Sequence, residues 1–437
     1  MPRRHDIDAL RVIVFALLIV YHVGMVYVAD WGFHVKSAYL AEWLQWPMIA
    51  LNRWRMPLLF MISGIALGLA RIDRAPLRFA ARRCWRLLLP LAFGMFVVVA
   101  VQAYCEGLAN GRLQPGFWAF LLRYWQLRPW PSGSFTGAEF GITWNHLWYL
   151  AYLWLYTMLL VALLPLRMLR TAEWLAGWRW PTWLLLSLPV AWLAMCRLVL
   201  APRFPETHAL FGDWTVHAQS LPLFLAGYAI AGNIGFWERI RALRWPVLAI
   251  ALACITIELT IRAGGRYLPP DAAVPAWIPW AEVERIARAA YTWTALLAIF
   301  GWGQVLLDRR FRWLPYCTEA VYPWYILHQS LIVPLAFWLS PVQLGPVLEP
   351  ALVLGGTVGG CLLLHELVIR RAPLLQPLFG LKRGRATAHC AAERISHSLD
   401  LTKNARLQRS TPARSRVPDA CPCPQKMPSA PIRCRSK

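Results

Sequence analysis

An arginine and a histidine, Arg11 and His22, stand at the two ends of the apolar run RVIVFALLIVYH. If the run is helical, the step between them covers about 16 Å of rise and returns to within about 20° of the same face. A neutral imidazole titrates near neutrality, so it can accept a proton from an attacking hydroxyl and later return it. The pair therefore predicts a polar track along one side of one helix, with His22 as a general base.

Only a few other ionisable residues lie inside apolar segments, and these are Arg53, Arg55, His328 and Glu366. Such residues cost roughly 2.5–3.5 kcal/mol at the centre of an inserted helix, which makes each of them a functional candidate. Plainer interpretations stay open. A histidine such as His328 can hydrogen-bond between helices, and Glu366 can pair with an arginine at the same end of the bundle.

The composition indicates which elements hold these residues. Of 437 residues, 58% are hydrophobic and only 15% are charged, which is typical of a polytopic membrane protein and not of a soluble domain. Apolar windows long enough to cross a roughly 30 Å hydrocarbon core predict an all-α bundle of about ten transmembrane helices. The windows fall near 9–29, 43–70, 87–104, 145–166, 182–200, 217–235, 245–262, 289–307, 317–339 and 348–369.

Basic residues concentrate in alternate connections between these windows, for example in 71–86 and 309–312. The positive-inside rule therefore predicts that both termini are cytoplasmic. The first window follows a short basic stretch, as in a signal peptide, but it is too long and lacks a small-residue cleavage site. We expect it to be a retained span, so that residues 1–383 form one integral membrane domain.

The segment 384–437 is polar, basic and rich in Pro, Ser and Ala, which predicts a disordered cytoplasmic tail. The net charge of +23 arises partly from this tail and partly from the topological bias, so it does not indicate nucleic-acid binding. Cys421 and Cys423 form a lone C-x-C without a second pair at zinc-like spacing, and no metal site is expected.

Several segments, in their order along the chain, resemble the acyltransferase-3 family of integral membrane acyltransferases, most closely its glucan-modifying branch, which includes the succinyltransferase of periplasmic glucans. The resemblance covers about residues 5–382. The segments that carry it are DIDALRVIVFALLIVYH, RMPLLFMISG, RRCWRLLLP, NHLWYL, LPLFLAGY, YPWYILHQ and HELVIRRAPLLQPLFGLK.

The resemblance implies transfer of an acyl group, acetyl or succinyl, from cytoplasmic acyl-coenzyme A to a hydroxyl of an extracytoplasmic glycan, at the bacterial inner membrane. Acyl-coenzyme A is then a co-substrate, and no tightly bound cofactor is expected. The family's catalytic histidine and its arginine fall on His22 and Arg11, and an acidic residue of the last span falls on Glu366. The basic cluster that opens the third span falls on Arg82, Arg83 and Arg86.

The chemistry of the residues agrees with this assignment. Arginine forks bind phosphate oxygens through two parallel hydrogen bonds, so an arginine rim suits coenzyme A. Arg55 or Ser63 is a candidate donor to the tetrahedral oxyanion. The matching segments also make His146, Trp148 and His328 candidates for substrate binding, although interfacial anchoring is the commoner role of such a tryptophan.

Two other classes of protein stay open at this point. Intramembrane Arg, His and Glu would equally suit a transporter of a glycan or acyl-donor intermediate, but we find no matching halves with broken helices. A noncatalytic sensor or scaffold would not need the spacing between Arg11 and His22.

Overall fold

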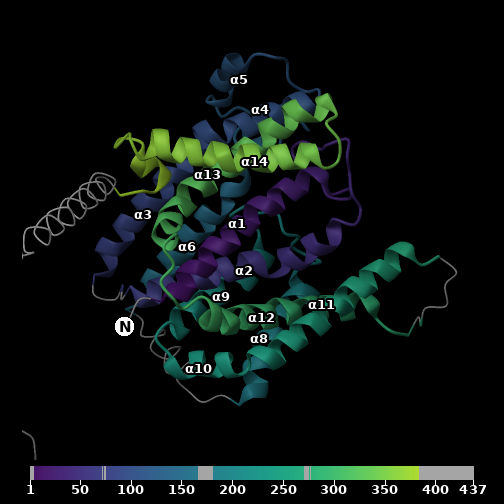
Figure 1. Ribbon diagram of the computed structural model, residues 1–437, viewed down its shortest axis with the longest axis vertical. Coiled ribbons are helices and arrows are strands. Elements are labelled where there is room, and N and C mark those ends of the chain that lie inside the picture. The colour runs from purple at the N-terminus through teal and green to yellow at the C-terminus, as the bar shows by residue number, and fades with distance from the viewer. Residues whose placement is uncertain are drawn as a thin grey trace, which may run out of the picture. The chain divides into compact units, whose positions relative to one another are not determined.

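The computed structural model describes residues 4–70, 72, 75–165, 181–269, 275 and 277–382. Within these ranges every regular element is helical, in agreement with the predicted all-α class (Figure 1). The predicted tail, 384–437, lies outside the described residues. The principal helices are α1 (His5–Tyr27), α2 (Gln45–Leu69), α3 (Pro76–Phe93), α4 (Ala100–Ala109), α5 (Phe117–Tyr124), α6 (Trp148–Leu163), α8 (Thr182–Met195), α9 (Trp214–Ile230), α10 (Ile234–Ala242), α11 (Arg244–Tyr267), α12 (Trp280–Leu306), α13 (Leu314–Leu339) and α14 (Leu348–Leu363).

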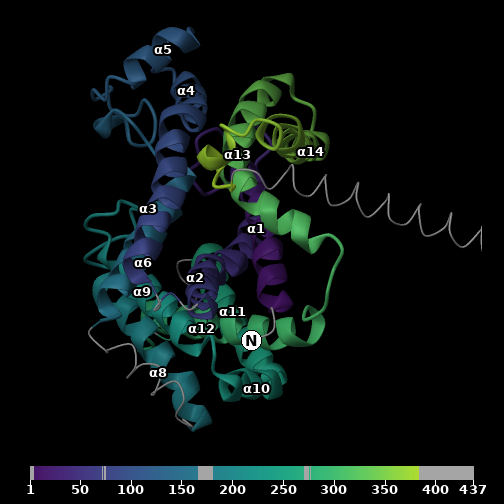
Figure 2. The same ribbon diagram turned by 90° about the vertical axis from the view of Figure 1, so that its left-hand side faces the viewer.

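Short helical turns extend or link the principal helices. The π-helical turns cover Gly94–Val98, Cys196–Leu200 and Leu364–Ile369, and the 3-10 turns cover Ala138–Phe140, Asn145–Leu147, Ser340–Val342 and Gln376–Phe379. In Figure 2, α3 and α4 follow one line toward α5, joined through the first of the π-helical turns.

Seven helices in the described part are long and apolar enough to cross a membrane, or eight if the bent pair of α9 and α10 counts as one span. The prediction of about ten spans is therefore met only in part. The 25-residue α2 and the 27-residue α12 also have the length to span. Adding them would give ten, and that count, like the cytoplasmic placement of both termini, stays a prediction.

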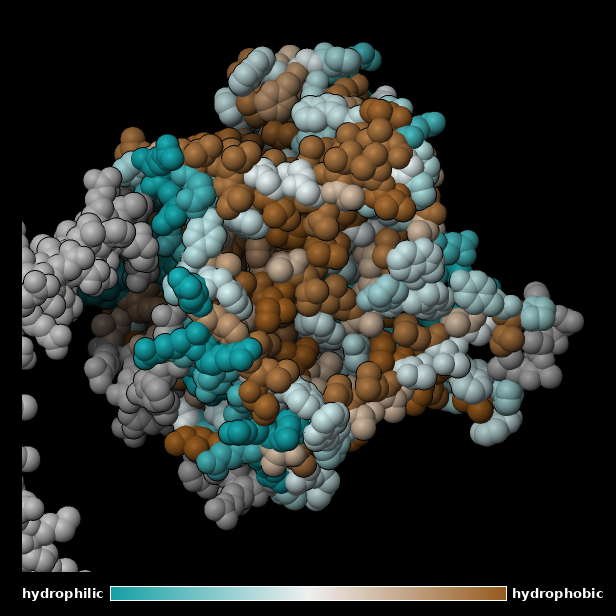
Figure 3. Space-filling model, viewed as in Figure 1, coloured by the Kyte–Doolittle hydropathy of each residue, from teal (hydrophilic) through white to brown (hydrophobic). Residues whose placement is uncertain are grey.

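The helices bring distant loops together at two opposite ends of the bundle. At one end, the Arg4 guanidinium lies 3.9 Å from the Trp237 ring of α10. At the other end, Arg266 bonds to Asp30 and Glu42 in the loop that follows α1, at 2.6 and 3.2 Å. Between them, hydrophobic side chains cover much of the face in Figure 3, and hydrophilic ones gather toward its left edge.

The helix that carries Arg55 packs against α9 at backbone contact. A Cβ atom added at Gly64 of α2 would lie 1.9 Å from the carbonyl oxygen of Phe224, and one added at Gly227 of α9 would lie 2.2 Å from that of Met61. Only glycine fits at these two positions, and small residues commonly allow such close helix approach in membranes. This close packing fixes the position and the rotation of α2 relative to α9. It therefore also fixes the positions of the polar residues on α2.

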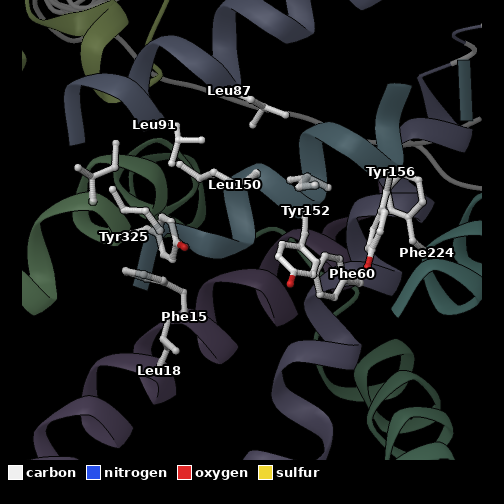
Figure 4. Close-up of a cluster of buried hydrophobic side chains, with 14 of the residues drawn as sticks. Phe15, Leu18, Phe60, Leu87, Leu91, Leu150, Tyr152, Tyr156, Phe224 and Tyr325 are labelled. Carbon is white, nitrogen blue, oxygen red and sulfur yellow. The ribbon is translucent and has the colours of Figure 1, made fainter. Parts of the chain in front are cut away.

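A large apolar cluster lies beside the candidate residues, between α1, α2, α6, α9 and α13 (Figure 4). Tyr152, Tyr156 and Phe60 are fully buried in it, and the Phe15 ring of α1 lies 5.8 Å from the His328 ring. Packed side chains of this kind hold their neighbours in single rotamers. The cluster therefore positions α1 and α13 relative to each other.

Arg53, one of the intramembrane candidates, has a structural partner. Its Nε and Nη2 atoms donate to Oε1 of Glu258 in α11, at 2.8 and 2.5 Å. Glu258 is fully buried, and Arg262 lies 3.4 Å from the same oxygen. A charge buried with its partner is stable, whereas removal of one partner leaves the other charge uncompensated. We therefore interpret Arg53 as part of a clamp between α2 and α11.

This clamp gives a stability prediction. Glu258→Gln should destabilise the protein by about 3 kcal/mol or more, because the Arg53 charge stays buried without a counter-charge. The matched control is Glu284→Gln, which removes a half-exposed partner of Arg262 and should cost about 1 kcal/mol or less. Thermal unfolding in detergent checks both variants. Equal midpoints for Glu258→Gln and the wild type would contradict the clamp.

Candidate active site

The structure brings His22 of α1 and His328 of α13 into direct contact, although 306 positions separate them in the chain. His22 Nδ1 lies 3.1 Å from His328 Nε2, and the ring centroids are 5.1 Å apart. His328 is fully buried and His22 is partly exposed. The predicted base therefore lies at the more accessible end of an imidazole pair.

Backbone carbonyls define the proton positions in this pair. His328 Nδ1 lies 2.8 Å from the carbonyl oxygen of Tyr325 and 3.2 Å from that of Trp324. Carbonyl oxygens only accept, so Nδ1 carries the proton, and Nε2 of a neutral ring is an acceptor. His22 Nδ1 must then donate to it. This leaves a lone pair on His22 Nε2, which has no hydrogen-bond partner among the described residues.

His146 lies behind this pair, with its ring centroid 4.9 Å from that of His328. Its Nε2 donates to the carbonyl oxygens of Tyr325 and Ile326 at 3.0 and 3.2 Å, and its Nδ1 lies 3.4 Å from the Gln102 amide nitrogen. Protein groups therefore engage both ring nitrogens of His146. This geometry favours support of α13 over the predicted contact with substrate, which stays a prediction.

Arg55 of α2 approaches His22 through Tyr21. Its guanidinium carbon is 3.7 Å from the Tyr21 ring centroid, and the Tyr21 ring lies 5.7 Å from the His22 ring. Arg55 is only 6% exposed, yet its Nε and Nη1 atoms have no hydrogen-bond partner in the described part of the chain. Unused buried N–H donors beside a base are suited to an oxyanion. Arg55 therefore meets the predicted role better than the other candidate, Ser63.

Ser63 lies deeper in α2, about 12 Å of helical rise beyond Arg55. Its hydroxyl is 2.8 Å from the Tyr149 hydroxyl of α6, which also donates to the Leu59 carbonyl oxygen at 3.2 Å. The structure therefore does not bring Ser63 and Arg55 together, and Ser63 belongs to a polar group nearer the basic end of the bundle.

At that basic end, the predicted arginines differ in their surroundings. Arg11 bonds to Asp8 at 3.1 Å, and Arg83 is half-buried within electrostatic range of Arg11, Arg86 and Tyr149. The Nε atom of Arg83 is buried without a hydrogen-bond partner in the described region. Arg82 and Arg86 are exposed. Arg11, Arg83 and Arg86 therefore lie near one another, and Arg83 has a buried N–H group that is available to bind a ligand.

Tyrosine side chains connect this rim to the histidines. The Tyr149 ring lies 6.2 Å from the Tyr325 ring, whose centroid is 6.0 Å from that of His328. The Tyr322 hydroxyl donates to the Arg86 carbonyl oxygen at 2.9 Å. Tyrosines of α6 and α13 therefore lie between the rim and the histidines, whereas the polar track along α1 stays a prediction.

The comparisons with known proteins bear on this arrangement. A family model described as an acyltransferase domain, that of the acyltransferase-3 family, matches residues 4–366. The chain belongs to the acyltransferase-3 family. No curated protein and no solved structure matches the chain. The family and the apolar helices together identify a membrane acyltransferase, whereas the resemblance to the glucan-modifying branch stays a prediction.

For this acyltransferase, Glu366 stands apart from the histidines. Its carboxylate accepts hydrogen bonds from Arg370 Nη1 at 3.0 and 3.1 Å, and Arg370 also lies 3.3 Å from Glu319. This is the charge pair that the sequence left open as the plainer interpretation. No contact in the described residues joins Glu366 to His22, so its catalytic role stays a prediction without geometric support.

The acyltransferase also contains a buried polar network that the sequence analysis missed. His34, in the loop after α1, lies 2.5 Å from Glu106 and 2.8 Å from the Gln329 amide nitrogen, while Glu106 accepts from the backbone and hydroxyl of Thr136 at 2.9 and 2.8 Å. The network ties two loops to α13 beside His328. Gln329 follows His328 directly in the sequence, which is the one signal that could have pointed to it.

Among the described residues, no three His, Cys, Asp or Glu side chains are placed to hold a metal ion, and this includes the histidine cluster. In the cluster of His22, His146 and His328, most ring nitrogens form hydrogen bonds with protein groups. The exception in the cluster is His22 Nε2, which makes it the one candidate proton acceptor there.

Proposed function

We propose that this membrane acyltransferase is an O-acyltransferase of the bacterial inner membrane, which moves an acetyl or succinyl group from cytoplasmic acyl-coenzyme A to a hydroxyl of an extracytoplasmic glycan such as a periplasmic glucan. The single observation that supports it most is the lone pair of His22 Nε2, beside the unused donors of Arg55. A base and an oxyanion donor are the two groups that acyl transfer needs.

The chemical step follows from these positions. His22 Nε2 removes the proton of the acceptor hydroxyl as its oxygen attacks the thioester carbonyl, and Arg55 stabilises the oxyanion that forms. Collapse of this intermediate breaks the carbon–sulfur bond. The coenzyme A thiolate then takes the proton from His22, which returns the base to its starting form. His328 positions His22 throughout, because its Nε2 accepts a hydrogen bond from His22 Nδ1.

At the basic end, Arg11, Arg83 and Arg86 would hold the phosphates of coenzyme A, with the thioester extended along Tyr149 and Tyr325 toward His22. Guanidinium groups bind phosphate oxygens in pairs of hydrogen bonds. The family match favours an acyltransferase over a transporter without transfer chemistry. The acceptor would approach from the opposite end, where Trp148 begins α6.

The arginine rim gives a prediction for the donor. Arg83→Gln should raise the KM for acyl-coenzyme A about tenfold or more with little change in kcat, because it removes a charge-assisted contact to phosphate. The control is Arg78→Gln, an exposed arginine on the same helix. Transfer of a labelled acyl group, measured in vesicles with the basic end outward, tests both variants. An unchanged KM for Arg83→Gln would contradict the rim, and a wild type without transfer would contradict the proposed function.

A further inference from the structure

The loop 201–213, which precedes α9, holds His208 in a conformation that side chains seldom adopt. The φ angle of His208 is +57°, in the left-handed region, which is uncommon for a residue other than glycine. The His208 N–H donates to Asp213 at 3.0 Å, and the fully buried Asp213 carboxylate also accepts from the Tyr152 hydroxyl at 2.7 Å. A buried carboxylate therefore fixes the direction of the His208 side chain.

That direction places His208 on Trp148. The ring centroids are 4.3 Å apart with an interplanar angle of 31°, while the His208 side chain stays exposed. Trp148 begins α6 two residues after His146, whose ring adjoins His328. The two rings form an aromatic platform that is open to solvent and close to the histidine pair.

The groups around His208 keep its imidazole neutral. Packing against neighbouring side chains lowers the pKa of His208, whereas Glu206 and Asp213 raise it and Arg55 lowers it further. A neutral imidazole offers one donor and one acceptor.

A carboxylate, that of Glu206, lies two residues before His208 on the same loop. Glu206 is 37% exposed, and it lies 3.1 Å from Arg197 and 3.6 Å from Arg288. Partial burial raises the pKa of Glu206, but Arg197 and Arg288 lower it to below its usual range, so the carboxylate is ionised at neutral pH. Two guanidiniums balance the Glu206 charge, and its partly exposed carboxylate can still accept hydrogen bonds.

We infer that Trp148, His208 and Glu206 form a subsite for a sugar unit of the acceptor, an inference that rests on the proposed function. The apolar face of a sugar ring packs on aromatic rings, which combine a large apolar surface with polar edges. Sugar hydroxyls donate hydrogen bonds to an ionised carboxylate, which can only accept.

The test measures direct binding to the full chain in lipid nanodiscs. The probes are a tritium-labelled neutral glucose oligosaccharide and coenzyme A. The variants are His208→Ala and Glu206→Gln, and the control is Phe211→Ala, an aromatic residue on the same loop that is 90% exposed. We expect the neutral probe to bind at least tenfold more weakly to His208→Ala and to Glu206→Gln, and normally to the control.

Wild-type affinity for the oligosaccharide in both variants would overturn the subsite. Coenzyme A binding reports on the proposed function separately. If the wild type binds the oligosaccharide but not coenzyme A, the donor assignment fails while the subsite stands. Normal coenzyme A binding by His208→Ala also shows that this variant is folded.

Discussion

His22→Ala should lower acyl transfer about 10³-fold, while the protein still inserts in the membrane and binds acyl-coenzyme A. A positioned general base contributes roughly 10²–10⁴-fold to the rate, and the structure offers no other imidazole of the cluster with a free nitrogen among the described residues. The substitution removes the proton acceptor but leaves the arginine rim and the Arg55 donors in place. The KM for acyl-coenzyme A should therefore change little.

The control for this variant is Val20→Ala, on the same helix. Val20 is 51% exposed on the outer surface of α1, so its truncation removes little packing and no polar contact. It should transfer the acyl group at the wild-type rate. A His22→Ala protein that is correctly inserted and retains more than about a tenth of wild-type activity would exclude the general-base role. Loss of a general base should lower the rate by more than about tenfold.

His328→Leu should lower kcat about 10²-fold without a matching change in the KM for acyl-coenzyme A. His328 has no free nitrogen, since Nδ1 bonds to backbone carbonyls and Nε2 faces His22. We therefore interpret it as a positioning residue that selects the His22 tautomer, where the sequence predicted a substrate contact. Leucine has a side-chain volume similar to that of histidine but cannot accept a hydrogen bond from His22 Nδ1. The His22 ring is then free to adopt the tautomer with the proton on Nε2, which cannot act as the base.

A conservative variant separates positioning from packing. His328→Gln keeps an amide oxygen near the place of Nε2, so it can accept from His22 Nδ1 and should recover a substantial part of kcat. If the glutamine and leucine variants lose activity equally, packing explains the effect. A raised KM for the acceptor with unchanged kcat would instead support the original prediction of a substrate contact.

The sequence predicted the helical class and the first-span pair because both depend on local features. Apolar windows specify helices in lipid, and the position of His22 relative to Arg11 is set by helical geometry alone. The contact of His22 with His328 could not be predicted in this way, since it depends on how α1 packs against α13. The same holds for His34 and Glu106, which meet only because the loop after α1 folds against α4.

Glu366 illustrates the opposite limit. Its position in an apolar helix marked it as a functional candidate, but the π-helical turn over Leu364–Ile369 places it beside Arg370, four residues on. Arg53 was likewise conspicuous in the sequence and is paired with Glu258. A buried charge can be identified from the sequence, but only the tertiary structure shows whether a neighbour neutralises it.

The measurement that tests the central claim most directly is mass spectrometry of cell-envelope glycans. Three strains are compared, with the wild-type protein, with His22→Ala, and with no protein. The account predicts a mass increment on a glycan from the wild-type strain alone, and the size of the increment identifies the acyl group. Glycans that are identical in all three strains, or an increment that persists with His22→Ala, would contradict acyl transfer by His22.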